Sequence, residues 1–212
     1  MKVVIDSNII IADFEMGTDA FIAVLENTRN GRINLCIPDV VIDEVLNKFR
    51  QVIEKPLMDL TTAIARLRRY TRKNIEISVG NEFLQEAYNE YSLRLLKRIA
   101  ENNVHIIPYP NTLHKNMAYR AMSVKRPFNS NEKGYRDSLI WENLKEIITY
   151  ENVNNKTEVK AIFITMNTKD FMSEDDLLHE DLVKELVDLG FESDSLIVYR
   201  NLSDFVKERC EV

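Results

Sequence analysis

The sequence predicts an α/β protein in which helices cover both faces of a central parallel sheet. Five short runs rich in β-branched residues are separated by longer segments whose apolar residues recur at helical spacing. None of these runs shows the strict alternation of a half-exposed strand, so we expect strands that are buried on both faces. Because strands that alternate with helices pair in parallel through right-handed crossovers, the expected architecture is a three-layer α/β/α sandwich with a sheet of about five strands.

Polar residues, proline or asparagine bound each of the expected strands. Helical spacing is clearest after the second run, at Val41 and Val45, and before the fourth, at Ile140 and Leu144. In chain order, the expected strands are residues 2–6, 33–37, 104–107, 160–165 and 195–199.

The segment between the second and third expected strands, residues 38–103, is too long for one crossover connection. Its pattern favours a run of helices that includes residues 56–74 and 81–101. A chain of 212 residues of which 45% are hydrophobic is long enough to bury a full core. We therefore expect a single domain over residues 1–212 with a helical insertion, between the second and third strands, at about residues 56–101.

Composition excludes several classes of protein. With 5 glycines, 5 prolines and 29% charged residues, the chain resembles neither a turn-rich β protein nor a disordered one. Asp6 and Asp13 interrupt the apolar opening, which is far too short for a membrane span or an export signal. We therefore expect a cytoplasmic protein without membrane attachment, in which Cys36 and Cys210 are reduced thiols.

The net charge of −6 argues against a general nucleic-acid coat, but the charge is unevenly distributed. Residues 102–131 contain no Asp or Glu, and they include Lys125 and Arg126. Residues 66–73 form a second cationic block, for which a solvated helix face is the favoured interpretation. The basic groups therefore lie apart from the acidic residues that carry the chemical interest.

Two acidic residues follow strands that are expected to be parallel. Asp6 closes the first strand, and Asp170 comes shortly after the strand that ends at Thr165. In a parallel sheet, ligands bind beyond the carboxyl ends of the strands. Either acid alone could equally cap the next helix, but two strand ends that bring acids to one edge favour a site.

Two further acids lie on helices that could face the same edge. Glu44 is preferred over Asp43, because Glu44 follows Val40 and Val41 at helical spacing and therefore lies nearer the core. Asp137 comes at the start of an apolar-faced helix, where it could act as a cap or point into a cleft. For both residues a solvated position remains the alternative.

Clustered carboxylates have a common use in holding Mg²⁺ or Mn²⁺, which prefer hard oxygen ligands. Close carboxylates repel one another unless a cation lies between them. The three histidines show no zinc-binding spacing, and the sequence contains neither a GxxxxGK phosphate loop nor a GxGxxG turn. We therefore expect a site for a hard divalent cation.

Four segments resemble the motifs of PIN domains in the order in which that family has them. MKVVIDSNIII resembles the opening strand, and IPDVVIDEVLNKF the helix that carries the family's Glu. KGYRDSLIW and FITMNTKDF resemble the segments of the third and fourth acids. The last two, with RPF ahead of them, are similar to a bacterial subgroup that has an extended helical middle.

The resemblance implies a PIN-like ribonuclease fold, a Mg²⁺ or Mn²⁺ site and cleavage of single-stranded RNA. It assigns Asp6, Glu44, Asp137 and Asp170 as catalytic and metal-binding residues, with Ser7 and Asn8 orienting them. The chain departs from the usual Thr-x-Asp-x-Asp at Asn167, which would be a neutral ligand unless Asp170 alone supplies the fourth acid.

The resemblance leaves open a homodimer and an inhibitory protein partner. It also implies that basic residues near the third acid contact RNA phosphates and that aromatic residues there contact the bases. The residues expected to bind substrate are Lys125, Arg126, Arg136 and Phe128, with Tyr135 as an alternative stacking residue.

Two other functions fit the same residues. A catalytically weak or inactive PIN-like RNA-binding or regulatory module would account for Asn167 in place of an acid. A DNA-directed nuclease would use the same acids, because nothing in the sequence addresses the 2′-hydroxyl group of RNA.

Overall fold

The structure is a computed structural model that describes residues 1–74, 80–112, 114–129, 131, 133–155, 161–175 and 177–210. For residue 81 and residues 150–155 it describes the backbone only.

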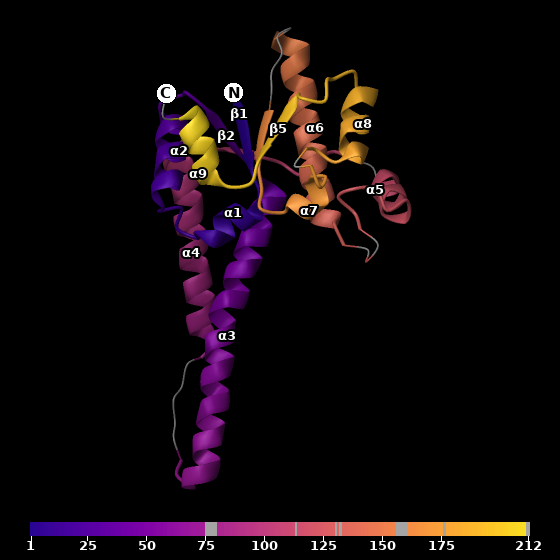
Figure 1. Ribbon diagram of the computed structural model, residues 1–212. Coiled ribbons are helices and arrows are strands. Elements are labelled where there is room, and N and C mark those ends of the chain that lie inside the picture. Colours follow the sequence, from indigo (N-terminus) through magenta and orange to yellow (C-terminus); the bar gives the residue numbers. More distant parts are fainter. Residues whose placement is uncertain are drawn as a thin grey trace.

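A five-stranded parallel sheet forms the centre of the molecule, with the strand order β3-β2-β1-β4-β5 (Figure 1). The chain adds strands outward from β1 on one side and then on the other, so the order reverses between β1 and β4. In open α/β sheets such a reversal leaves a crevice beyond the carboxyl ends. The strands are β1 (Lys2–Ile5), β2 (Asn34–Pro38), β3 (His105–Ile107), β4 (Ala161–Ile164) and β5 (Leu196–Tyr199).

The predicted fold class is confirmed, and each strand lies within two residues of its expected bounds. Residue 160, with which the fourth strand was expected to begin, lies outside the described residues. The central strands are buried on both faces: Val3, Val4 and Ile5 are fully buried, as are Ile162 and Phe163. Burying a side chain of this size stabilises a fold by roughly 1.5–3 kcal/mol, which explains the continuous apolar runs in the sequence.

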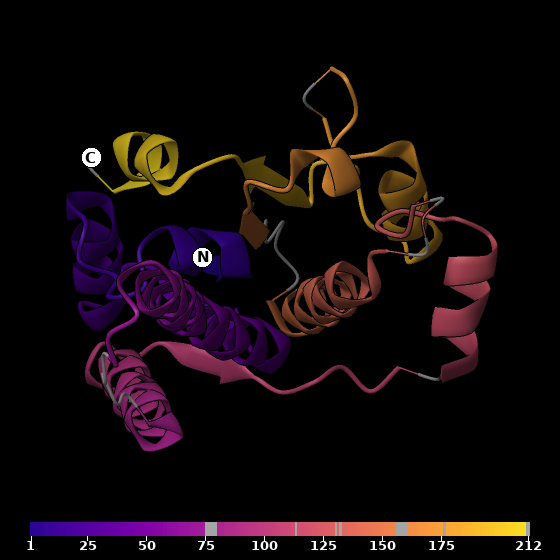
Figure 2. The same cartoon turned by 90° about the horizontal axis from the view of Figure 1, so that it is seen from below.

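Helices cover the two faces of the sheet (Figures 1 and 2). On one face α2 packs against β2 and α9, and on the other α6 packs against β4 and the start of α3. The helices are α1 (Ser7–Ala12), α2 (Asp19–Arg29), α3 (Asp39–Thr71), α4 (Asn81–Glu101), α5 (His114–Met122), α6 (Tyr135–Asn155), α7 (Thr168–Phe171), α8 (Glu180–Asp188) and α9 (Leu202–Arg209).

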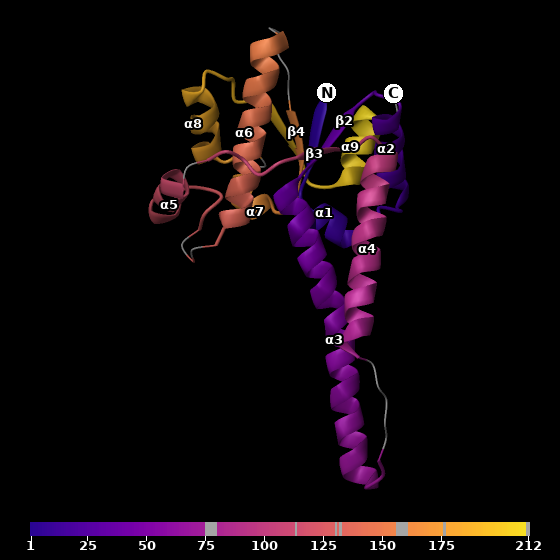
Figure 3. The same ribbon diagram turned by 180° about the vertical axis from the view of Figure 1, so that it is seen from behind.

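Helices α3 and α4 lie side by side and project from the sheet as a long arm (Figures 1 and 3). The 33 residues of α3 correspond to about 50 Å of helix. Near the base of the arm, the rings of Phe49 and Tyr91 stack with their centroids 3.9 Å apart.

The helices expected at residues 56–74 and 81–101 are present, but the first is part of a longer helix that begins at Asp39. Pro56 lies inside α3, although proline removes a backbone hydrogen bond. We attribute the continuity of α3 to its packing on α4, which sequence spacing does not reveal. Whether residues 56–101 are an insertion in a single domain stays a prediction.

Within the described residues, no helix combines the length and the apolar character that a membrane crossing requires.

Candidate active site

Asp6 lies at the carboxyl end of β1 and is also the N-cap of α1. Asp6 is only 2% exposed to solvent. Oδ1 accepts hydrogen bonds from the backbone N–H of Ser7 at 2.6 Å and from Ser7 Oγ at 3.3 Å. Oδ2 accepts one from Asn8 Nδ2 at 2.7 Å. The residue therefore caps α1 while its carboxylate lies at the carboxyl edge of the sheet, and both residues expected to orient it contact that carboxylate.

Thr165, at the end of β4, is a site residue that the sequence analysis missed. Its hydroxyl is buried and donates to Asp6 Oδ2 at 2.5 Å. The same oxygen accepts from the backbone N–H of Asn167 at 2.9 Å and lies 3.3 Å from Asn8 Nδ2. The pairing of β1 with β4 creates this contact between residues 159 positions apart, so the only sequence signal was its place at a strand end.

Glu44 points from the first turns of α3 toward α1. Its Oε2 accepts a hydrogen bond from Ser7 Oγ at 3.0 Å, and its Oε1 pairs with the Arg136 guanidinium. The neighbouring Asp43 turns away and accepts a hydrogen bond from the Tyr109 hydroxyl at 2.6 Å. The structure thus directs Glu44, rather than Asp43, toward Asp6.

Asp137 lies in the first turn of α6 and is connected to the loop after β4. Asn167 Nδ2 donates to Asp137 Oδ1 at 3.1 Å. In this arrangement Asn167 acts as a donor to an acid, whereas one of the two interpretations of the sequence made it a neutral metal ligand. Asn167 also forms the N-cap position of α7, so it links α6 to the segment that carries Asp170.

Asp170 lies in the short helix α7, and Arg126 is its cationic partner. Arg126 Nη1 lies 3.2 Å from Asp170 Oδ1, and the two side chains are 32% and 19% exposed. Arg126 and Arg136 therefore each pair with one acid, Asp170 and Glu44 respectively. Both guanidinium groups, which the sequence analysis expected to contact RNA phosphates, therefore lie beside the acids.

The four acids influence one another electrostatically, although they come from different elements. Burial raises the pKa of Asp6 above its usual value. Hydrogen bonds from Thr165 and Ser7 lower this pKa and the charge of Glu44 raises it, but the net effect is a raised pKa. Burial also raises the pKa of Asp137 to about 7, helped by the charges of Asp6, Asp170 and Glu44. The fold therefore crowds negative charge where water cannot screen it well.

This donor set suits a hard divalent cation, which would neutralise the crowded carboxylates. In the part of the chain that the structure describes, no three His, Cys, Asp or Glu side chains lie close enough together to ligate one ion. Mg²⁺ commonly takes one or two carboxylates and fills its other positions with waters and substrate phosphate. The residues present therefore fit a cation held mainly by water and a few carboxylates, not an all-protein cage.

The remaining expected substrate-binding residues differ in their placement. Lys125 is exposed, and its Nζ lies 5.8 Å from the centre of the Tyr119 ring. Phe128 is only 4% exposed and packs edge-on against Tyr135, with the ring centroids 6.5 Å apart. The expectation that Phe128 stacks on a base is therefore wrong for this structure, because its ring is part of the core. Tyr135 is 50% exposed and remains the candidate for stacking on a base.

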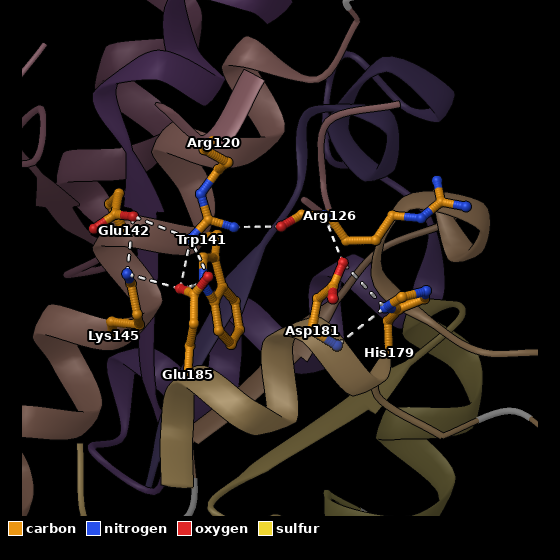
Figure 4. Close-up of polar contacts among 8 residues, drawn as sticks. All are labelled: Arg120, Arg126, Trp141, Glu142, Lys145, His179, Asp181 and Glu185. Atoms are coloured by element: carbon orange, nitrogen blue, oxygen red, sulfur yellow. Dashed lines mark hydrogen bonds and ion pairs between the residues drawn. The ribbon is translucent and has the colours of Figure 1, made fainter. Parts of the chain in front are cut away.

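A second polar cluster, absent from the sequence analysis, surrounds Glu185 of α8 (Figure 4). Glu185 accepts hydrogen bonds from the buried Arg120, from Trp141 Nε1 at 2.8 Å and from Lys145 Nζ at 3.0 Å. Burial alone would raise the pKa of Glu185, but the hydrogen bond from Trp141 and the charges of Arg120 and Lys145 lower it overall. Trp141 lies in the core, with its N–H satisfied by this cluster.

One of the comparisons with known proteins agrees with the fold. A family model described as PIN domain matches residues 3–171, which is most of the chain. Neither the search of curated proteins nor that of solved structures produced a match. PIN domains are generally nucleases and typically use divalent metals. On the strength of the family match and of the parallel five-stranded sheet, this chain belongs to the PIN-domain family.

Proposed function

We propose that this PIN-domain chain is an endoribonuclease that hydrolyses single-stranded RNA with the help of Mg²⁺ or Mn²⁺. The observation that carries the proposal is the electrostatic coupling of acids from separate elements at the carboxyl edge of the sheet. Buried, like-charged carboxylates are costly to a fold, and perturbed groups of this kind cluster at functional sites. A cation and a phosphodiester are the ligands that would balance this charge.

In the proposed site, Asp6, Asp137 and Asp170 would hold the cation directly or through its bound waters, and Glu44 would complete the cluster or orient a water. A bound Mg²⁺ or Mn²⁺ supplies activation of that water and stabilisation of charge on the phosphate in the transition state. Thr165, with Ser7 and Asn8, donates hydrogen bonds to Asp6, which favour its ionised, ligating form.

The two guanidinium groups near the acids suit the substrate rather than the cation. Arg126 and Arg136 pair with Asp170 and Glu44, and a phosphate could take over these contacts. Asn167, held against Asp137, would keep that carboxylate in position. Lys125 and Tyr135 are exposed close by in sequence, and they suit contacts with the backbone and a base of the strand.

The experiment follows cleavage of a labelled single-stranded RNA by the wild type and Asp6→Asn, in Mn²⁺ and in EDTA. We expect cutting only by the wild type in Mn²⁺. A matched pair on α3 adds a control, because Glu44→Gln should reduce cleavage strongly whereas Asp43→Asn, which changes an acid bonded to Tyr109, should not. Cutting that persists in Asp6→Asn or in EDTA would disprove the proposed site.

A second candidate function is a non-catalytic RNA-binding or regulatory module. Two observations favour it: Asn167 occupies a position where the family pattern has an acid, and no three acids within the described residues gather around one point. A thermal shift in Mn²⁺ separates the candidates, since specific binding to the folded state must raise its stability. No shift and no cleavage would favour the regulatory module.

The choice of RNA rather than DNA as the substrate rests on the resemblance to PIN domains. The same assay with a single-stranded DNA of identical sequence tests it directly. Faster cleavage of DNA would keep the acidic site and change the substrate class.

A further inference from the structure

A polar hollow of about 800 Å³ opens beside Asp170. It lies among the segment after α5, the helix α7, the start of α8 and the residue that follows β5. The side chains that decide its chemistry are Arg126, Asn129, Lys169, Asp170 and Arg200, with Asn131 at its edge. A volume of this size is typical of pockets that hold a small organic ligand such as a nucleotide.

The lining combines cations with amides. Arg126, Lys169 and Arg200 supply positive charge from three different segments, and Asn129 and Asn131 supply groups that both donate and accept hydrogen bonds. Glu174 and Glu180 also line the hollow, so it is not uniformly basic. Cations suit a phosphate and amides suit the edge of a base, which together describe a nucleotide.

Arg126 is held in place through its backbone (Figure 4). Its carbonyl oxygen accepts a hydrogen bond from the Arg120 guanidinium, and its backbone N–H donates to Asp181 Oδ2 at 3.1 Å. Arg120 is itself fixed by Glu185 and lies 3.6 Å from Glu142. With both backbone groups occupied, the side chain extends away from this cluster, as Figure 4 shows, and reaches Asp170.

Asp170 joins the hollow to the acidic site. It lines the hollow, and its charge contributes to the raised pKa of Asp137. A strand whose phosphate lay at the acids would therefore have a neighbouring nucleotide within reach of Arg126. The Arg126 contact to Asp170 is partly exposed, and a phosphate can compete for the same guanidinium.

We propose that this hollow binds the nucleotide next to the scissile phosphate, and that Arg126 exchanges Asp170 for the phosphate of that nucleotide. The inference rests on the proposed nuclease function and adds to it a subsite with named residues. Lys169 and Arg200 hold the phosphate together with Arg126. Asn129 and Asn131 contact the base and so set which base is preferred at that position.

The test is direct binding of uridine and adenosine monophosphates to the full chain in EDTA, followed by NMR titration. Without the divalent cation, the readout depends on the hollow and not on catalysis. We expect the wild type to bind the monophosphates and Lys169→Ala to bind them about fivefold more weakly. Lys184→Ala, which removes an exposed cation of α8 outside the hollow, is the matched control and should bind like the wild type.

Uridine without phosphate serves as the ligand control and should bind far more weakly than its monophosphate. Equal weakening by Lys169→Ala and Lys184→Ala, or no binding of monophosphates to the wild type, would overturn the subsite. The outcome is separable from that of the proposed function. Cleavage without monophosphate binding removes the subsite alone, and binding lost in Lys169→Ala without any cleavage removes the nuclease alone.

A second measurement addresses base preference. Mapping the cut positions in a mixed RNA should give a changed preference at one neighbouring nucleotide for Asn129→Ala, while the wild type and Lys184→Ala agree. An unchanged pattern would contradict the role given to the amides.

Discussion

At the scale of one residue, the fold favours the protonated form of Asp137, whereas the proposed chemistry needs its ionised form. Its pKa rises to about 7 because it is buried and because Asp6, Asp170 and Glu44 lie near. An acid with a raised pKa in the folded state holds its proton over a range in which the unfolded chain has lost it. Ionising Asp137 therefore costs the fold stability at the pH at which a carboxylate can bind a cation.

We predict that the cation-free protein loses stability as the pH rises from about 4 to about 7, the interval between the ordinary pKa of 3.8 and the raised value. Asp137→Asn should remove the part of this loss that belongs to Asp137, leaving the part that comes from the raised pKa of Asp6, and should raise the free energy of unfolding at pH 8 by on the order of 2–4 kcal/mol. Urea denaturation in EDTA at several pH values measures it. Asp188→Asn, at the exposed end of α8, controls for the loss of one negative charge and should not reproduce the gain.

Thr165 offers a second test at this scale, because its hydroxyl is the shared partner of Asp6, Asn167 and Asn8. Thr165→Val keeps the shape and removes the hydroxyl, so a buried carboxylate loses a donor and a backbone N–H loses an acceptor. We expect a loss of about 2–3 kcal/mol of stability at pH 8. Thr165→Ser should stay close to the wild type in the same denaturation experiment, and equal losses in both variants would contradict this role.

Among the elements, the turn into α6 determines how Asp137 and Arg126 are brought together. Gly134 has φ +116°, and a Cβ there would lie 2.8 Å from Phe128 Cα and closer still to the Pro127 carbonyl oxygen. Both neighbours are backbone, so neither can move aside by a change of rotamer. The start of α6 and the segment that carries Arg126 are thus held in close backbone contact.

Gly134→Ala should therefore destabilise the protein by more than about 2 kcal/mol, from the positive φ and from the overlap together. Gly31→Ala is the matched control, because Gly31 also has a positive φ of 72° but open space around its Cβ position. Its cost should be about 1–2 kcal/mol. Thermal unfolding of both variants measures the difference, and equal costs would show that the close approach is unimportant.

The link between α5, α6 and α8 depends on Glu185, whose carboxylate gathers Arg120, Lys145 and the Trp141 N–H. Because the pKa of Glu185 is lowered, its contribution to stability is present at neutral pH and disappears as the pH falls through the lowered value. Glu185→Gln removes the shared counter-charge of Arg120 and Lys145, two largely buried cations that would then depend on Glu142. We expect a loss of about 3 kcal/mol at pH 7 in urea denaturation.

A control for this change is Glu192→Gln, which alters an exposed acid shortly after α8 and should stay within about 0.5 kcal/mol of the wild type. The loss in Glu185→Gln should shrink in strongly acidic buffer, where the wild-type carboxyl is also neutral. A loss that is independent of pH would contradict the ionic role of Glu185.

At the scale of the whole molecule, the order of the strands brings distant segments to one edge. Asp6 follows the central strand β1, the residues after β4 approach it from one side, and the start of α3 from the other (Figure 1). The cation-free molecule thus folds around a concentration of negative charge. A ligand that neutralises this charge should stabilise the entire fold, because it binds only where the segments meet.

We predict that Mn²⁺ raises the thermal midpoint of the wild type, with a gain of about 2.7 kcal/mol when the ion is present at 100 times its Kd. The gain should be lost in Asp6→Asn. Asp43→Asn changes a neighbouring acid of α3 that lies outside the cluster, and this variant should keep the gain. Differential scanning calorimetry in Mn²⁺ and in EDTA makes the comparison, and identical midpoints of the wild type in both buffers would argue against a cation site.

The sequence by itself determined the strands, most of the helices and the set of acids at their ends. Buried parallel strands leave continuous apolar runs, and a carboxylate after such a run, as at Asp6, lies at the carboxyl edge whatever the details of packing. The preference for Glu44 over Asp43 also came from local spacing, because the helical period fixes which side of α3 turns inward.

Only the tertiary structure decided which side chains meet. The hydroxyl of Thr165 contacts Asp6 because β1 and β4 are neighbours, Phe128 enters the core because α6 begins beside it, and Glu185 collects cations from two other helices. Each of these contacts joins residues that are far apart in the chain, and a local sequence pattern does not show which distant residue a side chain will meet. The position of the acids near the edge of the sheet is thus visible in the sequence, whereas the groups that hold them and the hollow beside them arise from packing.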